Sequence, residues 1–420
     1  MSERGVLLDL RPLRESAAFR RVFVARTISI LGIGMLMVGV PIQVYDLTGS
    51  SFLVGVVAAV EGAASMGGML IGGTLADRHD RKKLILFART VSGLTFVGLA
   101  VNAMVDGPSW QVIIALAVIN GLIGSISIAA LFAVVPTLVP REQLVGVGAL
   151  NVLSARVGAV ISPALGGVVI AAFAVSWNYW VAALGTVVTI VLLSGLPALP
   201  PPAPQHHDAA AGGPPESMAQ FVARERVVGG VMIAGVVAML GSGVLVLVPG
   251  LVDERFGGDS WAAGLLYAAT AVGAVIATVT SGWLSRLARP GLVLLVALAA
   301  GFAVQAFVGL TGVLALALLL LVVVGAISSV QEVLRYALIQ THTPESMLGR
   351  VNGLWSAQEV AGVSIGALIA GAFGGVVSAS SAVVTYSLTM CAVALVSLLV
   401  LGTLRRAVAA PSPADSAVAA

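Results

Sequence analysis

The chain has 420 residues, of which 59% are hydrophobic and only 10% are charged, and its mean hydropathy is +1.05. About a quarter of the residues of a soluble globular domain are charged. A soluble fold of this length would need a charged surface that this composition does not supply. The composition therefore excludes a soluble protein and predicts that lipid surrounds most of the chain.

Twelve apolar runs are long enough to cross a bilayer as helices, which takes about 20 residues each. They lie at 20–44, 52–75, 83–105, 110–135, 145–171, 177–199, 226–251, 259–284, 289–311, 313–338, 349–374 and 380–404. The short alternating segments of a membrane β-barrel do not occur in the sequence. We therefore predict an all-α membrane protein with twelve transmembrane helices.

The basic residues predict how these helices are oriented, because Lys and Arg accumulate in loops that stay in the cytoplasm. Seventeen basic residues precede the first run, follow the last or lie in even-numbered loops: Arg4, Arg11, Arg14, Arg20, Arg21, Arg78, Arg81, Lys82, Lys83, Arg141, Arg224, Arg226, Arg286, Arg289, Arg350, Arg405 and Arg406. Odd-numbered loops contain only Arg255. Both termini are therefore expected in the cytoplasm, and no nucleic-acid partner is needed to explain the basic residues.

Between the sixth and seventh runs the sequence becomes rich in Pro, Ala and Gly, which is typical of a flexible linker. We expect an N-terminal six-helix half at 1–199, a cytoplasmic linker at 200–225, a C-terminal six-helix half at 226–404 and a cytoplasmic tail at 405–420. The segments 139–167 and 343–371 also align at a constant offset of 204, with Gly158 on Gly362. Internal repeats of this kind are typical of transporters built from two pseudo-symmetric halves.

The loop between the second and third runs, GGTLADRHDRKK, has a more specific residue pattern than the Lys and Arg that membrane orientation alone requires. It resembles the signature of the major facilitator superfamily, and the residues that carry the likeness are Gly73, Leu75, Ala76, Asp77, Arg78, Arg81 and Lys82. The resemblance implies the major facilitator fold and a latch at the inner gate between the halves. A glycine near the end of the second span would allow close helix approach. Asp80 stands where the family has a second glycine. The alternative is a loop that only sets topology.

The fifth run carries a second family pattern, which is typical of antiporters. Its members here are Gly158, Ser162, Pro163, Gly166 and Gly167, with Ser162 in place of one glycine. A proline removes a backbone hydrogen bond and bends the helix, and small residues allow tight packing. The alternative is ordinary tight packing without a role in coupling.

Several longer segments resemble one branch of this superfamily, the bacterial siderophore exporters that export enterobactin. They are 9–29, 72–89, 176–179, 196–202, 265–269, 288–292 and 340–358. The resemblance implies a monomer in the bacterial cytoplasmic membrane, without a cofactor, that exports a catecholate siderophore in exchange for protons. The alternative is a broad-specificity drug/proton antiporter.

Three carboxylates fall inside the apolar runs and away from their first and last residues, where a charge is costly and normally functional. Glu61 and Glu359 lie near the middle of their runs, and both are candidates for carrying the coupled proton. Each is equally well explained as a structural hydrogen bond or ion pair. Glu332 is a weaker candidate, because an ion pair with Arg335, three residues further along the helix, is expected.

Four other side chains are candidates for binding the substrate. Arg156 offers bidentate donors to an anionic or catechol-bearing molecule, although a salt bridge to one of the glutamates would suit it equally. The polar candidates are Asn151, Gln358 and Tyr267. Each of these is also explained by a hydrogen bond between helices.

Other functional classes lack the residues they need. An ATP-driven pump requires a phosphate-binding loop with a lysine, and neither of the two lysines, Lys82 and Lys83, follows that pattern. The four histidines all lie in loops, and no nucleophile with a base or set of metal ligands is apparent. We therefore expect a transporter without enzymatic activity or a metal site.

Overall fold

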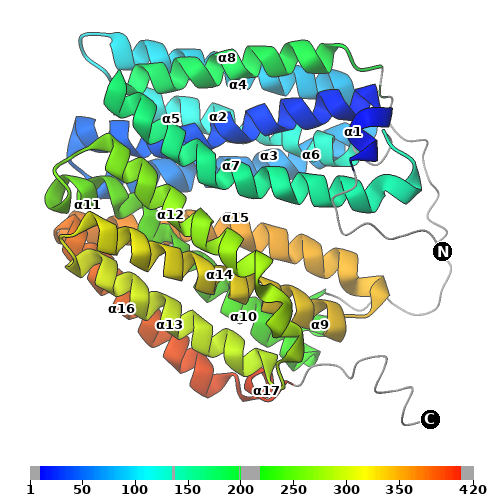
Figure 1. Ribbon diagram of the computed structural model, residues 1–420, viewed down its shortest axis with the longest axis vertical. Coiled ribbons are helices and arrows are strands. Elements are labelled where there is room, and N and C mark those ends of the chain that lie inside the picture. The colour runs from blue at the N-terminus through cyan, green and yellow to red at the C-terminus, as the bar shows by residue number, and fades with distance from the viewer. Residues whose placement is uncertain (1–9, 135–137, 198, 200–217, 408–420) are drawn as a thin grey trace. The chain divides into compact units, whose positions relative to one another are not determined.

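The computed structural model describes residues 10–134, 138–197, 199 and 218–407. Every regular element in these residues is a helix, and twelve helical segments are long and apolar enough to cross a membrane (Figure 1). The prediction of an all-α protein with twelve spans is confirmed. Part of the expected linker falls outside the described residues, and its end forms the short helix α9 (Met218–Arg224).

In the described residues, ten elements form the first six spans and the segments next to them. They are α1 (Arg11–Glu15), α2 (Ala17–Thr48), α3 (Ser51–Arg78), α4 (Arg81–Met104), α5 (Trp110–Ile119), the π-helical turn η1 (Asn120–Gly124), α6 (Ser125–Val134), η3 (Arg141–Gln143), α7 (Leu144–Ala172) and α8 (Val175–Ser194).

The last six spans follow α9. They comprise α10 (Arg226–Gly241), the 3-10 turn η4 (Ser242–Leu247), α11 (Val248–Arg255), α12 (Ser260–Val279), η5 (Ser281–Arg286), α13 (Pro290–Leu310), α14 (Leu314–His342), α15 (Glu345–Val376), α16 (Ala379–Val400) and α17 (Gly402–Arg405).

The chain forms two compact units. The first unit comprises the described part of Met1–His207 together with Gly257–Ala268, and the second comprises the described part of Asp208–Phe256 and Ala269–Ala420. Gly257–Ala268, which is expected in the C-terminal half from the sequence, groups with the first unit. The bounds of the two halves stay a prediction.

In the first unit α2 is packed between α7 and α8, and α4 lies against α8 (Figure 1). Polar side chains brace this packing: the hydroxyl of Tyr179 on α8 donates to Oε1 of Gln43 on α2 at 2.7 Å. Such hydrogen bonds between membrane helices contribute about 0.6 to 2 kcal/mol each. In the second unit α13 packs on α16 and α14, and α15 packs on α10 and η4.

Two spans that look continuous in the sequence are interrupted. The fourth contains η1 and the seventh contains η4. Each interruption lies where two backbones approach closely: a Cβ on Gly121 of η1 would lie 2.5 Å from the carbonyl oxygen of Glu61, and one on Gly243 of η4 would overlap the backbone of Gly366. π-Helical turns of this kind occur frequently at functional sites.

The repeat found in the sequence recurs in the packing of each unit. Gly158 and Gly362 are equivalent at the offset of 204. Gly158 of α7 lies against Ile30 of α2, and Gly362 of α15 lies against Met239 of α10. These equivalent contacts support two pseudo-symmetric halves.

Candidate functional site

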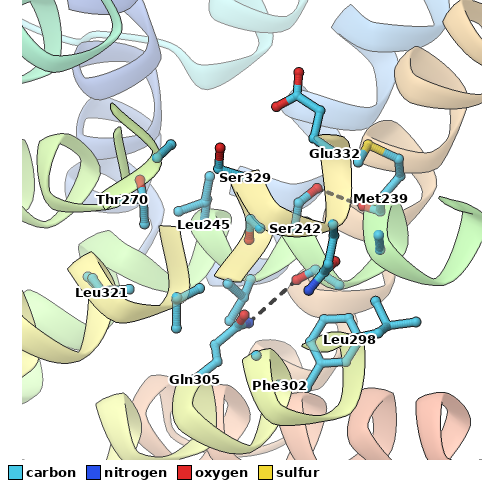
Figure 2. A pocket seen from close by; sticks show the side chains of 18 of the residues that line it. Met239, Ser242, Leu245, Thr270, Leu298, Phe302, Gln305, Leu321, Ser329 and Glu332 are labelled. Atoms are coloured by element: carbon cyan, nitrogen blue, oxygen red, sulfur yellow. Dashed lines mark hydrogen bonds between the residues drawn. The ribbon is translucent and has the colours of Figure 1, made fainter. Parts of the chain in front are cut away.

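The second unit contains a cavity of about 340 Å³, within the range of small-molecule pockets. Figure 2 shows it between α13, which contributes Phe302 and Gln305, and α14, which contributes Ser329 and Glu332. Most of the lining is apolar, and the ionisable lining residues are Glu332, Arg335 and Glu359. An apolar cavity with a few polar groups is the usual form of a ligand site.

Three polar side chains around this cavity donate to backbone carbonyls. The hydroxyl of Ser242 donates to the carbonyl of Met239 at 2.6 Å, and Nε2 of Gln305 donates to that of Gly241 at 3.4 Å (Figure 2). Nε2 of Gln331 donates to the carbonyl of Ala297 at 3.1 Å. These groups therefore hold the cavity wall in place.

Arg335 differs from these bracing residues. It is only 2% exposed, and its Nε and Nη2 atoms have no hydrogen-bond partner. Its guanidinium lies over the ring of Trp355 on α15, with 4.3 Å between Cζ and the ring centroid. A cation over a tryptophan face gains up to about 2 kcal/mol when it is desolvated. This contact holds the side chain in place but leaves two N–H groups unused.

Glu359 is joined to the same tryptophan. The indole N–H of Trp355 donates to Oε1 of Glu359, one turn further along α15. Both Glu359 and Glu332 are close enough to interact electrostatically with Arg335. In Figure 2 the carboxylate of Glu332 points away from Phe302 and Gln305. The expected ion pair between Glu332 and Arg335 stays a prediction, while Trp355 is the observed contact of the guanidinium.

Glu61 belongs to a separate arrangement in the first unit. It is half-buried on α3, and Oε1 accepts a hydrogen bond of 3.4 Å from Nδ2 of Asn120, the first residue of η1. Gly121, the next residue of η1, lies against the Glu61 carbonyl and the Ser65 hydroxyl. The π-helical turn thus brings an amide side chain to the half-buried carboxylate.

The structure brings together only some of the predicted site residues. Gln358, Glu359 and Glu332 lie in the second unit around Arg335. Asn151 and Arg156 are half-buried on α7 of the first unit. Tyr267 is buried on α12, in the part of that helix that groups with the first unit. Their roles as substrate contacts stay predictions.

The glycine and proline pattern of the fifth span lies in α7, at its packing face. Ser162 donates its hydroxyl to the carbonyl of Gly158 at 2.6 Å, next to Pro163, which interrupts the helical hydrogen bonds. Gly166 lies against the backbone of Met35 on α2. Gly167 lies against the segment Gly257–Ala268 of the same unit. Tight packing is therefore present, and a role in coupling stays a prediction.

The loop between α3 and α4 corrects one expectation. Within the first unit, a Cβ on Gly73 would meet nothing within 4 Å among the described residues, so the expected close helix approach is not made there with a helix of that unit. It occurs at Gly68, one and a half turns earlier, whose Cβ would overlap the Leu122 carbonyl. The reason is that Gly73 lies on an exposed face of α3.

The charged residues of this loop have different partners. Asp80 is the N-cap of α4, and Oδ1 accepts from the backbone N–H of Lys82 at 2.9 Å. Lys82 donates Nζ to the carbonyl of Leu196 at 2.5 Å, and Nε of Arg81 donates to that of Ala76 at 3.3 Å. Asp77 and Arg78 are exposed in the last turn of α3. Asp80 therefore has a structural role where the family has a glycine.

One buried charge was missed in the sequence. Arg89 lies on α4 and is only 9% exposed, and its Nε has no hydrogen-bond partner. The signal was available, because Arg89 falls inside the third apolar run. Among the described residues no group of three or more His, Cys, Asp or Glu side chains is placed to hold a metal ion.

Known proteins are similar in sequence to this chain along nearly its whole length. It is 41% identical to the enterobactin exporter EntS of Citrobacter koseri over 422 residues, 99% of this chain and 100% of that protein. It is 40% identical to the enterobactin exporter EntS of Shigella boydii serotype 4 over 409 residues, 97% of each chain.

Solved structures show the same fold at low sequence identity. The nucleoside transporter NupG has a TM-score of 0.71 and 11% identity, and the match covers 92% of this chain and 98% of that one. A bacterial homolog of the human lysosomal transporter Spinster has a TM-score of 0.67 and 15% identity, covering 93% and 95%. The family model described as Major Facilitator Superfamily matches residues 22–357 and 231–419. The chain therefore belongs to the major facilitator superfamily, a family of transporters and not of enzymes.

Proposed function

We propose that this protein exports a catecholate siderophore of the enterobactin type across the bacterial cytoplasmic membrane, in exchange for protons. The observation that carries the proposal is the identity of 40–41%, over nearly the full length, to proteins named enterobactin exporters. Both termini lie in the cytoplasm in this proposal, in agreement with the distribution of Lys and Arg. The protein works as a monomer.

Transport proceeds by alternating access of the two six-helix halves. A siderophore enters from the cytoplasm, and the halves then change which side of the membrane the binding site faces. The loop at Gly73 and Asp77 acts as a latch at the inner gate, and the bend at Pro163 in α7 biases the direction of exchange. The exposure of Gly73 and Asp77 leaves them accessible for such a contact.

Coupling requires a group that binds a proton from one side and releases it to the other. Glu359 is the first candidate because it lines the cavity that also contains Arg335. A catechol hydroxyl donates more strongly to the ionised Glu359 carboxylate than to its protonated form, because a hydrogen bond to a charged acceptor is the stronger one. Proton and siderophore therefore compete at Glu359, which is the condition for exchange. Glu61, bonded to Asn120, and Glu332 are the other candidates.

The function is tested in cells that make enterobactin but lack their own exporter. Expression of this chain is expected to restore enterobactin in the medium under iron starvation and to lower it inside the cells. In everted vesicles, a proton gradient should drive enterobactin uptake that a protonophore abolishes. Unchanged secretion in cells, together with no uptake by vesicles, would contradict the proposal.

A broad-specificity drug/proton antiporter is the second candidate. The antiporter-like pattern at Gly158, Ser162, Pro163, Gly166 and Gly167 favours it, because that pattern concerns coupling and not the cargo. Proton-driven efflux of unrelated cationic dyes, without enterobactin transport, would favour this reading.

A further inference from the structure

Three buried nitrogen donors gather at one point of the second unit without an acceptor. They are Nε and Nη2 of Arg335 and Nε2 of Gln358, none of which has a hydrogen-bond partner. A Cβ on Gly235 of α10 would overlap both Nη2 of Arg335 and Nε2 of Gln358. The two side chains thus meet over a glycine that gives them room.

Leaving such donors unpaired is costly. A buried polar group without a partner costs about 1–3 kcal/mol, and more when it is charged. By contrast, the two side-chain amides in the lining of the cavity, Gln305 and Gln331, each donate to a backbone carbonyl. The cluster therefore lacks an acceptor that a ligand would supply.

The two free nitrogens of Arg335 lie on the same edge of the guanidinium. Nε and Nη2 point their N–H groups in parallel, which matches two neighbouring oxygen atoms on a ligand. The ring of Trp355 lies against the same guanidinium and holds it in place. The geometry favours a bidentate acceptor.

The charged residues of the cavity favour a neutral ligand over an anionic one as the source of that acceptor. Glu332 and Glu359 line the same cavity as Arg335, so an anionic ligand would meet two carboxylates and one cation. A neutral catechol avoids this repulsion, because its oxygens accept from Arg335 and its hydroxyl hydrogens donate to a carboxylate. Phe302 and Leu298 supply apolar wall for the ring.

We propose that Arg335 and Gln358 anchor one catechol group of the substrate at the edge of the second-unit cavity. The inference rests on the proposed function and deepens it, since it names the residues and the part of the siderophore that they hold. Only one arm of the molecule is bound here.

The test uses the purified full chain in lipid nanodiscs and measures binding by calorimetry. The probes are enterobactin and 2,3-dihydroxybenzamide, with 3-hydroxybenzamide and benzoate as comparators. Wild type should bind the two catechols more tightly than either comparator. Tighter binding of benzoate would overturn the catechol assignment in favour of an anion site.

Variants at Arg335 test the anchor. Arg335→Met should weaken catechol binding at least about tenfold, the loss of a hydrogen bond to a charged group. Arg335→Lys keeps the positive charge but loses the two parallel N–H groups. Its affinity for catechols should therefore lie between that of wild type and that of Arg335→Met. Arg89→Met, which removes another buried arginine in the first unit, is the matched control and should bind as wild type does.

Variants at Gln358 distinguish a loss of binding from a loss of folding, because both the affinity for catechol and the Tm are measured. Gln358→Leu removes an unsatisfied donor, so catechol affinity should fall several-fold while the Tm does not fall. Gln358→Glu replaces the amide donor by a charged acceptor oxygen next to Arg335. It should raise the Tm and weaken catechol binding. A lower Tm in Gln358→Leu would mean that the amide oxygen already accepts from Arg335, which would overturn the proposal.

The outcomes separate this inference from the proposed function. Unchanged catechol affinity in folded Arg335→Lys and Gln358→Leu overturns the anchor while enterobactin export stands. Catechol binding that depends on Arg335, in a protein that does not export enterobactin, supports the anchor and removes the proposed function. Absence of catechol binding by wild type overturns the anchor, whatever vesicles transport.

Discussion

The indole N–H of Trp355 donates to a carboxylate oxygen of Glu359, one turn further along α15. The ring of the same tryptophan lies beneath the guanidinium of Arg335 on α14. One side chain therefore contacts both the cation proposed to hold the substrate and the acid proposed to carry the proton. A change in the charge of Glu359 acts directly on this group of residues, because Glu359 interacts electrostatically with Arg335.

Glu359→Gln should separate binding from coupling. The amide cannot release a proton, so enterobactin uptake driven by a pH gradient in everted vesicles should fall at least about tenfold, by the loss of one required step. Exchange of labelled for unlabelled enterobactin without a gradient should continue, because it needs no net proton movement. Glu345→Gln, at the exposed start of the same helix, is the control. Normal gradient-driven uptake by Glu359→Gln would move the coupling role to Glu61 or Glu332.

The number and type of the spans were predictable from the sequence, and their internal breaks were not. Lipid cannot satisfy free backbone groups, so long apolar runs leave helices as the solution. The turns η1 and η4 have the same apolar composition as their neighbours, as NGLIG and SGVLVL show. They depend on contacts with other helices, at Gly121 and Gly243, that no local pattern contains.

The candidate site was predictable only in part, for the same reason. Charges inside apolar runs are rare, so Glu332, Glu359 and Arg335 stood out in the sequence. The spacing of Glu332 and Arg335 on one helix suggested that they pair. It could not reveal Trp355 and Gln358, which reach Arg335 from α15. The donor cluster is a tertiary feature.

Gly73→Ala should distinguish a role of Gly73 in the latch, measured as transport, from a role in the stability of α3, measured as the Tm. Nothing lies within 4 Å of the added methyl group among the described residues, and alanine favours a helix over glycine by about 1 kcal/mol. The Tm should therefore stay or rise. If Gly73 is part of a latch that closes in another state, transport should fall several-fold nevertheless. Full transport by Gly73→Ala would leave the loop with a topological role only.

Glu254 holds the start of the last span. Its two carboxylate oxygens accept from the backbone N–H groups of Ala379 at 2.5 Å and Ser380 at 2.9 Å, at the N-terminus of α16. Loss of an acidic side chain at such a position costs about 1 kcal/mol. Glu254→Ala should therefore lower the free energy of unfolding by about that amount in a denaturant titration. Asp253→Ala, its exposed neighbour, should have little effect, and equal destabilisation by both would contradict the capping role.

Asp80 gives a prediction that distinguishes a cap from a gate. Its carboxylate caps α4 through the N–H of Lys82, in a loop where the family has glycine. Glycine is tolerated at an N-cap at a cost of a few tenths of a kcal/mol, whereas alanine costs about 1 kcal/mol. We therefore expect Asp80→Ala to destabilise the protein more than Asp80→Gly, with transport normal in Asp80→Gly. A loss of transport in Asp80→Gly at unchanged stability would show that the carboxylate works in the transport cycle, because the cap alone would not require it.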